Sequence, residues 1–454
     1  MSNTIKLKKG FNINLAGKAQ KQLAAELMPE MVAVKPTDFK GLLRPKPMVK
    51  EGDMVKVGTP VLYDKAQDTI MFSSPVSGEV IEIVRGAKRK LLEIRIKADG
   101  QQTAESFPQL AANEIVNLSR ESATELLTKG GVWPFIVERP YGILANPEHK
   151  PKAIFVSAFD SSPLAPDYAF ILKGEEKYFQ AGLDALTTLT DGPVHLGVSA
   201  DAEVASVFAE AKNVTIHRFK GKHPAGNVGV QIHHIDPINK GEVVWTVNPV
   251  GVANIGRLLL EGSYYPERII AVAGSEVNKP AYVKTVAGAS VAHITKGNIK
   301  EGVNRYISGN ILTGTSVGAD GYVGFFDSLL TVIPEGNEYE FLGWLKPSAN
   351  KLSHHRALGL LSFLNPNKEF VVDTNTKGEE RAFVDTIAFG KVLPMDVMPE
   401  YLLKAIMAED YDEMEALGIY EVIEEDLALC EFVDVSKHNV QAILREGLTL
   451  MQFS

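Results

Sequence analysis

The sequence predicts an α/β multidomain protein, because the type of hydrophobic pattern changes along the 454 residues. Short alternating segments between glycine-containing turns occupy residues 1–100 and are typical of a small β-sandwich. Apolar runs alternate with segments of helical period between residues 153 and 217, as in a parallel sheet covered by helices. Residues 395–454 show mainly helical spacing. A chain of this length is expected to hold two to four domains.

The composition is that of an ordinary globular protein. Hydrophobic residues make up 45% and charged residues 23% of the chain, which is enough for extensive buried cores. No apolar run approaches the roughly 18–20 residues that cross a bilayer, and the polar start does not predict a signal peptide. A single cysteine, Cys430, excludes an internal disulfide and fits a reducing cytoplasm. The net charge of −9 argues against general binding of nucleic acid.

The charge is distributed unevenly between the two ends of the chain. Residues 1–100 carry 18 Lys and Arg against 11 Asp and Glu, whereas residues 395–454 carry 3 against 14. This asymmetry indicates either a face turned toward an anionic surface or a partner, or two faces that are simply solvated.

The first predicted domain covers residues 1–100. The segment VKEGDMVKVGTPVL, followed by SSPVSGEVIEI, resembles the lipoyl/biotinyl domain, a flattened sandwich of two small sheets. In that family a lysine at a hairpin tip carries the cofactor. Lys65 imitates this lysine, but it stands ten residues before Pro75 where the modified families keep eight. We therefore expect Lys65 to be unmodified.

The second predicted domain covers residues 101–255. A short apolar run at 153–157 is expected to be a buried strand, and second and third strands are expected at 194–198 and 214–217. Helical spacing between the strands predicts helices at 179–189 and 203–211. This β-α-β-α-β alternation predicts a Rossmann-like parallel sheet.

A glycine loop lies at the start of this domain. A helix is expected from Asn117 to Lys129, with Ser122–Glu125 as its capping box. It runs into GGVWPF, Gly130 to Phe135. This loop resembles the GGAGFP loop of the flavin subunit of complex I and of the Rnf C subunit, which lies against FMN and NADH phosphates. Here the loop is shorter and Trp133 fills the gap, so both flavin and NADH binding are in doubt.

Two further loops follow predicted strands. AFDSSPLAPDY, residues 158–168, resembles the ECEPYxTAD segment of the same relatives, with Phe159 in place of the acidic Glu. GKHPAGN, residues 221–227, places a histidine beside a proline.

Two adjacent histidine pairs raise the possibility of a metal site. His233 and His234 are expected on a strand, where neighbouring side chains point to opposite faces and cannot share one ion. The same argument applies to His354 and His355 if that segment is regular. We therefore expect no structural metal.

The third predicted domain covers residues 256–346. A strand is expected at 268–274, a short helix ends at Ile294, and a strand follows in LLTVIPEG after Ser328. The segment VNKPAYVKTVAGAS and its surroundings resemble the β-grasp soluble-ligand-binding (SLBB) domain of the complex I flavin subunit.

The last region, residues 347–454, is expected to be a connector and a helical domain. Bacterial ferredoxins bind a 4Fe–4S cluster with the run C-x2-C-x2-C-x3-C-P. With Cys430 as the third ligand, the remaining positions of this frame hold Glu424, Leu427 and Asp434. A second frame fits upstream, at Phe383, Thr386, Phe389 and Leu393. One thiol cannot hold a cluster, so we expect a ferredoxin-like domain without clusters.

The order of these four parts, together with KRKLLEIRI, HPAG, VNKPAYVKTVAGAS and EEDLALC, resembles the A-subunit family of the Na+-translocating NADH:quinone reductase. That complex oxidises NADH, reduces a quinone and pumps Na+ across the bacterial inner membrane. The resemblance implies one peripheral subunit of six, on the cytoplasmic face, docked on an integral membrane subunit. It implies no FMN, covalent flavin, heme or iron–sulfur cluster in this chain, and a quinone as its substrate.

A quinone pocket needs apolar walls and one or two hydrogen-bond donors. The segment after the glycine pair and the proline-rich stretch Val34–Met48 could supply both. The candidate quinone-binding residues are Arg44, Gly130, Gly131, Trp133, Phe135 and Arg139. Core packing and surface charge are the alternative explanation for all six.

The isolated chain is expected to be inactive, because the redox cofactors would lie in other subunits. Two alternative functions remain open from the sequence. One is an assembly scaffold without a cofactor, and the other is a stand-alone oxidoreductase that binds flavin or NADH.

Overall fold

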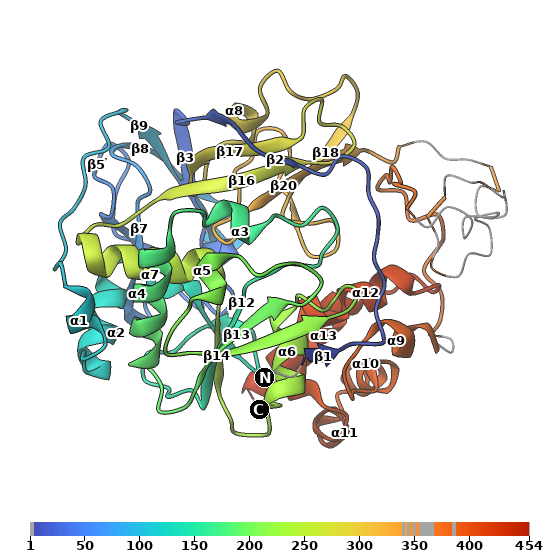
Figure 1. The fold of residues 1–454 in the computed structure, drawn as a ribbon. Coiled ribbons are helices and arrows are strands. Elements are labelled where there is room, and N and C mark those ends of the chain that lie inside the picture. Colours follow the sequence, from blue (N-terminus) through green and yellow to red (C-terminus); the bar gives the residue numbers. More distant parts are fainter. Residues whose placement is uncertain are drawn as a thin grey trace.

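A computed structural model describes residues 4–337, 341–342, 346, 348, 351–352, 354, 367–383 and 387–453. Within these residues the strands form four sheets, and the C-terminal part is helical. Figure 1 shows the parallel sheet in the middle, with the β-sandwich and a second large sheet on one side and the C-terminal helices on another. None of the described helices is both long and apolar enough to cross a membrane.

The β-sandwich is built from two small sheets. The first has the order β3-β9-β8-β5, with β3 Met31–Val34, β5 Met54–Val55, β8 Gly78–Arg85 and β9 Leu91–Ala98. The second has the order β4-β6-β7, with β4 Pro45–Pro47, β6 Pro60–Asp64 and β7 Gln67–Ser73. The short helices η1 (Pro36–Asp38) and η2 (Ala87–Arg89) connect strands. Val32, Leu62 and Ile94 are fully buried in this part of the core. Lys65 lies at the tip of the β6–β7 hairpin, where the sequence placed it.

The first residues of the chain do not join the sandwich. β1 (Thr4–Lys6) pairs in parallel with β14, and β2 (Gln20–Glu26) pairs in parallel with β17. The sequence prediction groups these residues with the sandwich because they are adjacent to it in the chain. Strand partners are chosen by tertiary contacts, which the local pattern does not contain.

The central sheet has the order β1-β14-β13-β12-β15-β10-β11. Its strands are β12 Ala153–Ser157, β13 Val194–Ser199, β14 Thr215–Lys220, β15 Val244–Val247, β10 Ile136–Arg139 and β11 Ile143–Leu144, in addition to β1. β12 to β15 are parallel, and β10 and β11 are antiparallel additions at one edge. The three strands expected at 153–157, 194–198 and 214–217 are found as β12, β13 and β14, of which β14 is only partly buried.

Helices cover this sheet. They are α1 Ala112–Ile115, α2 Arg120–Lys129, η3 Trp133–Phe135, α3 Tyr168–Ile171, α4 Glu176–Thr187, α5 Ser206–Ala209, α6 Val228–Ile235 and α7 Pro249–Glu261. Helices α4 and α7 cross closely at two glycines, since a Cβ on Gly182 or Gly256 would lie 1.9 Å from a carbonyl oxygen of the other helix. The chain moves from β12 outward to β14 and then returns to β15 on the other side of β12. Such a reversal opens a crevice at the carboxyl ends of the strands.

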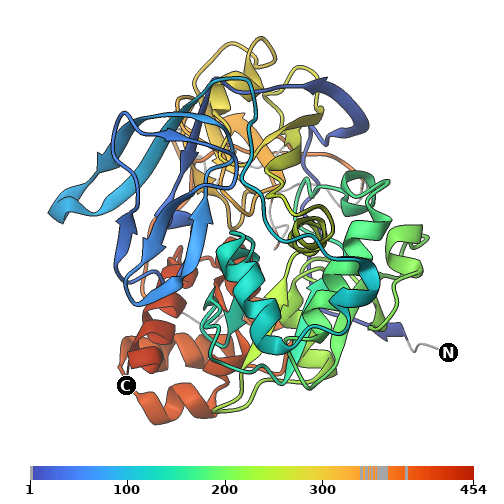
Figure 2. The same ribbon diagram turned by 90° about the vertical axis from the view of Figure 1, so that its left-hand side faces the viewer.

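The second large sheet has the order β19-β18-β20-β16-β17-β2. Its remaining strands are β16 Glu267–Ala273, β17 Ala281–Val286, β18 Asn304–Ser308, β19 Thr315–Ser316 and β20 Leu329–Pro334, and α8 Val291–Thr295 packs beside them. The C-terminal helices are α9 Ile387–Val392, α10 Pro399–Met407, α11 Tyr411–Ala416, η5 Ile419–Glu421, α12 Glu424–Val433 and α13 Val440–Phe453. Figure 2 shows these helices below the sandwich on the same side of the molecule.

Two local predictions are wrong. Helix α2 is capped by Ser119, whose side chain accepts a hydrogen bond from the Ser122 N–H. The N-cap is therefore three residues earlier than predicted, and the residue three places after it is Ser122, so the helix has a serine cap and not the predicted capping box.

The prediction that His233 and His234 lie on a strand is also wrong, because both lie on helix α6. His233 is close to Glu421 and His234 to the Val230 carbonyl, so the two rings have different partners. Thr386 and His355 lie outside the described residues.

Candidate functional site

A cleft with a volume of about 370 Å³ opens at the carboxyl ends of β12 and β15. Asp160 follows β12, and Asn248 follows β15. The other walls come from Phe39 after η1, Phe326 before β20, and Glu425 in the first turn of α12. All four parts of the structure therefore meet at this cleft. Its position is the reversal point of the sheet, where parallel α/β sheets usually bind ligands.

One wall of the cleft is apolar and aromatic. Phe39, Pro134, Phe135 and Phe326 line it, and Phe159, which follows β12, also lines the cleft. Phe39 and Phe326 have ring centroids 5.7 Å apart, and Phe135 and Phe326 have centroids 6.4 Å apart. Edge contacts of this kind fix ring orientation. The wall is therefore a preformed surface for a flat, apolar ring.

The floor of the cleft is ionic. Arg139, at the end of β10, has 1% of its side chain exposed. It donates from Nη1 to Asp426 Oδ2 at 2.8 Å and from Nη2 to Glu425 Oε1 at 2.7 Å. Asp426 Oδ2 also accepts from the Ile423 N–H at 3.0 Å. These bonds fasten the start of α12 to the central sheet. Helix α6 can approach them because residue 229 is glycine, where a Cβ would lie 2.4 Å from both Asp426 carboxylate oxygens.

A second ion pair lies at the same helix start. Glu424 accepts from Lys40 Nζ at 2.7 Å and from Arg445 Nε at 2.6 Å. Burial by itself would raise the pKa of the Glu424 carboxyl, but the two cations outweigh it and lower that pKa to about 2. Glu424 is thus paired with Lys40 and Arg445, while Glu425 and Asp426 share Arg139. All three acids lie at the positive end of the helix dipole, which stabilises their charge.

Several ionisable groups in the cleft are perturbed. Burial raises the pKa of Glu425 to about 7 and that of Asp38 to about 6. Burial also raises the pKa of Asp160 and of Tyr168, where nearby carboxylates add to the effect. Burial lowers the pKa of His223 to about 4, so its imidazole is neutral at pH 7. Such a cluster of shifted groups in a cleft is typical of functional sites.

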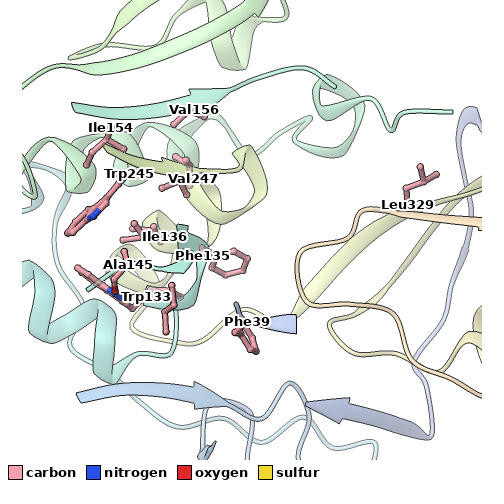
Figure 3. Close-up of a cluster of buried hydrophobic side chains, with 14 of the residues drawn as sticks. Phe39, Trp133, Phe135, Ile136, Ala145, Ile154, Val156, Trp245, Val247 and Leu329 are labelled. Atoms are coloured by element: carbon pink, nitrogen blue, oxygen red, sulfur yellow. The ribbon is translucent and has the colours of Figure 1, made fainter. Parts of the chain in front are cut away.

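The structure brings only two of the six predicted quinone-binding residues to this cleft, Phe135 and Arg139. Trp133 is fully buried on the other side of its segment, where its Nε1 donates to the Ala145 carbonyl at 2.8 Å. Its ring packs against that of Trp245, with centroids 5.4 Å apart. Figure 3 shows the two tryptophans together and Phe135 on the side of Phe39.

The remaining three predicted residues have packing or surface positions. A Cβ on Gly130 would lie 2.3 Å from the Leu258 side chain, and one on Gly131 would lie 2.2 Å from Ser73 Oγ. Gly131 also has a φ of +73°, which favours glycine. Arg44 is exposed and does not line the cleft, and its backbone N–H donates to Asp64.

Sequence reasoning did not identify Asp38, Asp160, Tyr168, His223 or Glu425 as site residues. A signal was available for most of them. Asp160 and Tyr168 belong to the segment AFDSSPLAPDY after β12, His223 to GKHPAGN after β14, and Glu425 to EEDLALC. Polar groups that follow parallel strands meet at one edge of the sheet, so the first three could have been grouped.

The described residues contain no group of three or more His, Cys, Asp or Glu side chains that could hold a metal ion. Cys430 is fully buried in α12, and burial raises the pKa of its thiol. The neighbouring frame positions have structural partners. Glu424 is paired as described above, Leu427 is buried, and Asp434 accepts from the Ser436 and His438 N–H groups.

Three family models match the chain. They are described as the NqrA N-terminal barrel-sandwich hybrid domain over residues 5–99, the NqrA second alpha/beta domain over 118–264, and the NQRA C-terminal domain over 269–319. The first supports the assignment of a barrel-sandwich domain at the N-terminus.

Curated relatives match over nearly the whole chain, and each is named as the A subunit of a Na(+)-translocating NADH-quinone reductase. The protein of Alcanivorax borkumensis is 37% identical over 449 residues, which is 99% of both chains. Those of Neisseria meningitidis serogroup A and Yersinia pestis are each 38% identical, with the same coverage. A solved NAD+-reducing [NiFe]-hydrogenase covers 77% of this chain and 66% of its own at 10% identity and a TM-score of 0.38, a likeness too weak to carry an argument.

Proposed function

Because this chain belongs to the A-subunit family of the Na+-translocating NADH-quinone reductase, and is thus one subunit of that enzyme complex, we propose that it binds the quinone in the cleft at β12 and β15. The observation that carries the proposal is the combination of an aromatic wall with a polar floor. Quinone-sized ligands need this combination of apolar contact and a few placed hydrogen-bonding groups.

The polar groups suit the two carbonyl oxygens of a quinone. The Tyr168 hydroxyl has a raised pKa and is protonated at neutral pH, so it can donate. Glu425 can donate when it carries a proton, and its pKa of about 7 allows this near neutral pH. Phe159 and Phe326 offer faces for the ring.

The charge of the cleft favours a neutral ligand over a nucleotide. Asp38, Asp160 and Glu425 line it with only Lys40 and Arg139 as cations. Both cations already pair with carboxylates of α12. Phosphate groups of FMN or NADH would therefore find no unpaired cation among the described residues that line the cleft. This argues against the stand-alone flavin or NADH enzyme.

The finer architecture is part of the same proposal. We assign a Rossmann-like domain to residues 101–255, a β-grasp domain to 256–346, and a ferredoxin-like domain without clusters to 347–454. The parallel order of β12 to β15 and the all-helical region from α9 to α13 support these assignments. The chain would dock at the cytoplasmic face of the inner membrane, on the integral membrane subunit, and would bring no redox cofactor of its own. Nucleic acid is not expected as a partner.

The assembly scaffold is the second candidate. The observation in its favour is that ion pairs between distant segments hold the parts together at the cleft. Arg139 and Asp426 are 287 residues apart in sequence, and Lys40 and Glu424 are 384 apart. A scaffold needs such rigidity but no ligand.

Titration of tryptophan fluorescence with a short-chain quinone distinguishes the quinone-binding function from the scaffold function. Trp133 and Trp245 lie behind the cleft wall and report on it. We expect saturable quenching by the quinone, and none by FMN or NADH. Phe159→Ala should raise the Kd about tenfold through loss of one aromatic face. Arg44→Ala is the matched control and should leave it unchanged.

Absence of saturable quenching in the wild-type chain and in the assembled complex would favour the scaffold. Equal effects of Phe159→Ala and Arg44→Ala would place any quinone site elsewhere.

A further inference from the structure

We propose that Glu425 is the acid that passes a proton to the quinone oxygen during reduction, and that Arg139 and Asp426 are the positioning residues that make it available. The inference rests on the proposed function, because it needs the quinone in the cleft. Glu425 is the member of the ion cluster that combines cleft exposure with a shared cation.

One guanidinium serves two carboxylates in this cluster. The Asp426 side chain is fully buried, and its Oδ2 accepts both from Arg139 and from the Ile423 N–H. Asp426 therefore supplies the fixed negative charge that neutralises Arg139. Glu425 takes only the second arm of Arg139 and has 39% of its side chain exposed. When both carboxyls are ionised, the cluster carries one excess negative charge.

A proton on Glu425 removes this excess charge. Arg139 then keeps its pair with Asp426, so no buried charge is left without a partner. Asp426 is fully buried and accepts two N–H donors on Oδ2, whereas Glu425 accepts only from Arg139 and lines the cleft, where its proton can reach a ligand. The geometry therefore places the mobile proton on Glu425.

The groups around Glu425 come from several elements. Arg139 of β10 and Lys40 after η1 favour its ionised form. Asp426 on its own helix and Asp160 after β12 disfavour it, together with burial. Tyr168 of α3 also lies within electrostatic reach of Glu425 and Asp160. Burial outweighs the cations, and the resulting pKa of about 7 makes both forms available near neutral pH.

The other cleft acids are less suitable. Asp38 pairs with the buried Lys35 at 3.3 Å and accepts from the Phe325 N–H at 2.9 Å. Asp160 accepts from the Ser162 N–H at 2.7 Å and has no cation partner to receive its charge after proton loss. Glu425 has that cation in Arg139.

The chemical balance is simple. Reduction of a quinone to a quinol takes two electrons, which the complex draws from NADH, and two protons. In one of the two protonations the O–H bond of Glu425 breaks and an O–H bond to the quinone oxygen forms. The carboxylate left behind stays on Arg139 Nη2 and regains a proton from water through its exposed edge. The second proton comes from water that enters the open cleft.

The test uses the complete complex with substitutions in this chain. Glu425→Gln keeps size and polarity but cannot give a proton. We expect its kcat for quinone reduction at pH 6 to fall about 100-fold, the scale of a lost general acid. The Kd for short-chain quinone should change by no more than about twofold. The wild-type kcat should fall above about pH 7, and Glu425→Gln should lack this limb.

Two further variants complete the test. Glu413→Gln makes the same change on the exposed surface of α11 and should leave both kcat and the pH profile unchanged. Glu425→Asp keeps an acid but withdraws it from the quinone, so its rate should fall while the alkaline limb remains. If Glu425→Gln does not assemble, the fall in rate of Glu425→Asp decides the matter.

The outcomes separate the inference from the proposed function. Quinone binding without any change of kcat or pH profile in Glu425→Gln would overturn the role of Glu425 and leave the quinone site standing. In the case that only Glu425→Asp assembles, an unaltered rate would overturn it equally. Absence of quinone binding to the wild type would overturn the proposed function itself.

Discussion

The two halves of helix α12 have opposite surroundings. Its first turn, Glu424 to Asp426, contributes Glu425 to the cleft, and each of its carboxylates meets a cation from a distant part of the chain. Its second half carries Leu427, Leu429 and Cys430, all almost fully buried among apolar side chains. The thiol there has a raised pKa and no ionic partner. The ionic contacts of this helix therefore lie in its first turn, and we expect its chemistry there and not at the cysteine.

The largest effect is expected at the cation that joins this first turn to the central sheet. Arg139→Ala would leave Asp426 buried without its partner, and loss of one member of a buried ion pair costs about 3–5 kcal/mol. Urea unfolding followed by fluorescence would measure this loss. Arg44→Ala is the control and should change the free energy of unfolding by less than about 0.5 kcal/mol. Equal values for the two variants would mean that the first turn is not held by Arg139.

A smaller effect is expected where α6 approaches the ion cluster. Gly229→Ala would place a Cβ 2.4 Å from the Asp426 carboxylate. Forced movement of this kind typically costs about 1–3 kcal/mol. The control is Gly390→Ala, because Gly390 lies in a helix with open space around it. Gly241 also has open space, but its positive φ makes it unsuitable. Gly390→Ala should be neutral or stabilising, and thermal unfolding would compare the two. A neutral Gly229→Ala would contradict the tight approach.

A substitution in the second half of the helix should lower stability but leave the activity of the complex unchanged. Cys430→Ser buries a hydroxyl in apolar surroundings and is expected to lower the free energy of unfolding by about 1–3 kcal/mol. Quinone reduction by the assembled complex should stay nearly intact, because no step needs the thiol. Steady-state assays at equal complex concentration test this. A collapse of activity with normal assembly would show that the contrast between the two halves is wrong.

The smallest effect is a pH dependence of stability. The pKa of Glu425 is about 7 in the folded chain against an ordinary 4.5. The folded state therefore holds this proton more tightly, and the stabilisation is present below pH 4.5 and lost as the pH rises to about 7. Glu425→Gln does not titrate, so its Tm relative to wild type should increase from about pH 5 to pH 8. Thermal scans at several pH values measure this, and a constant difference would contradict the raised pKa.

Much of the central sheet could be predicted from the sequence, and the cleft only in part. Strand β12 is a continuous apolar run, and β13 and β14 follow it with helical segments between them, so the alternation is visible in the residues themselves. The ion cluster joins Arg139 to residues 286 and 287 positions later, and no local pattern contains such a pairing. Trp133 and Phe135 belong to one short segment, yet one lies in the core and the other in the cleft wall. That difference depends on the turn η3, which the glycine loop resemblance did not describe.

The two glycines of that loop also show what the sequence alone cannot predict about the site. Their sequence signal suggested a ligand, but Gly130 and Gly131 are explained by the closeness of Leu258 and Ser73. Glycine is selected both for ligand approach and for packing of two elements. Only the positions of the neighbours distinguish the two reasons.

Hydrogen–deuterium exchange of the chain with and without a saturating short-chain quinone tests the central claim most directly. Bound quinone should slow exchange in the segments that line the cleft, 157–168, 223–228 and 246–249. Exchange in the outer hairpin 85–90 of the sandwich should stay the same. Protection confined to other segments, or no protection at a quinone concentration that saturates fluorescence quenching, would contradict a quinone site between β12, β15 and α12.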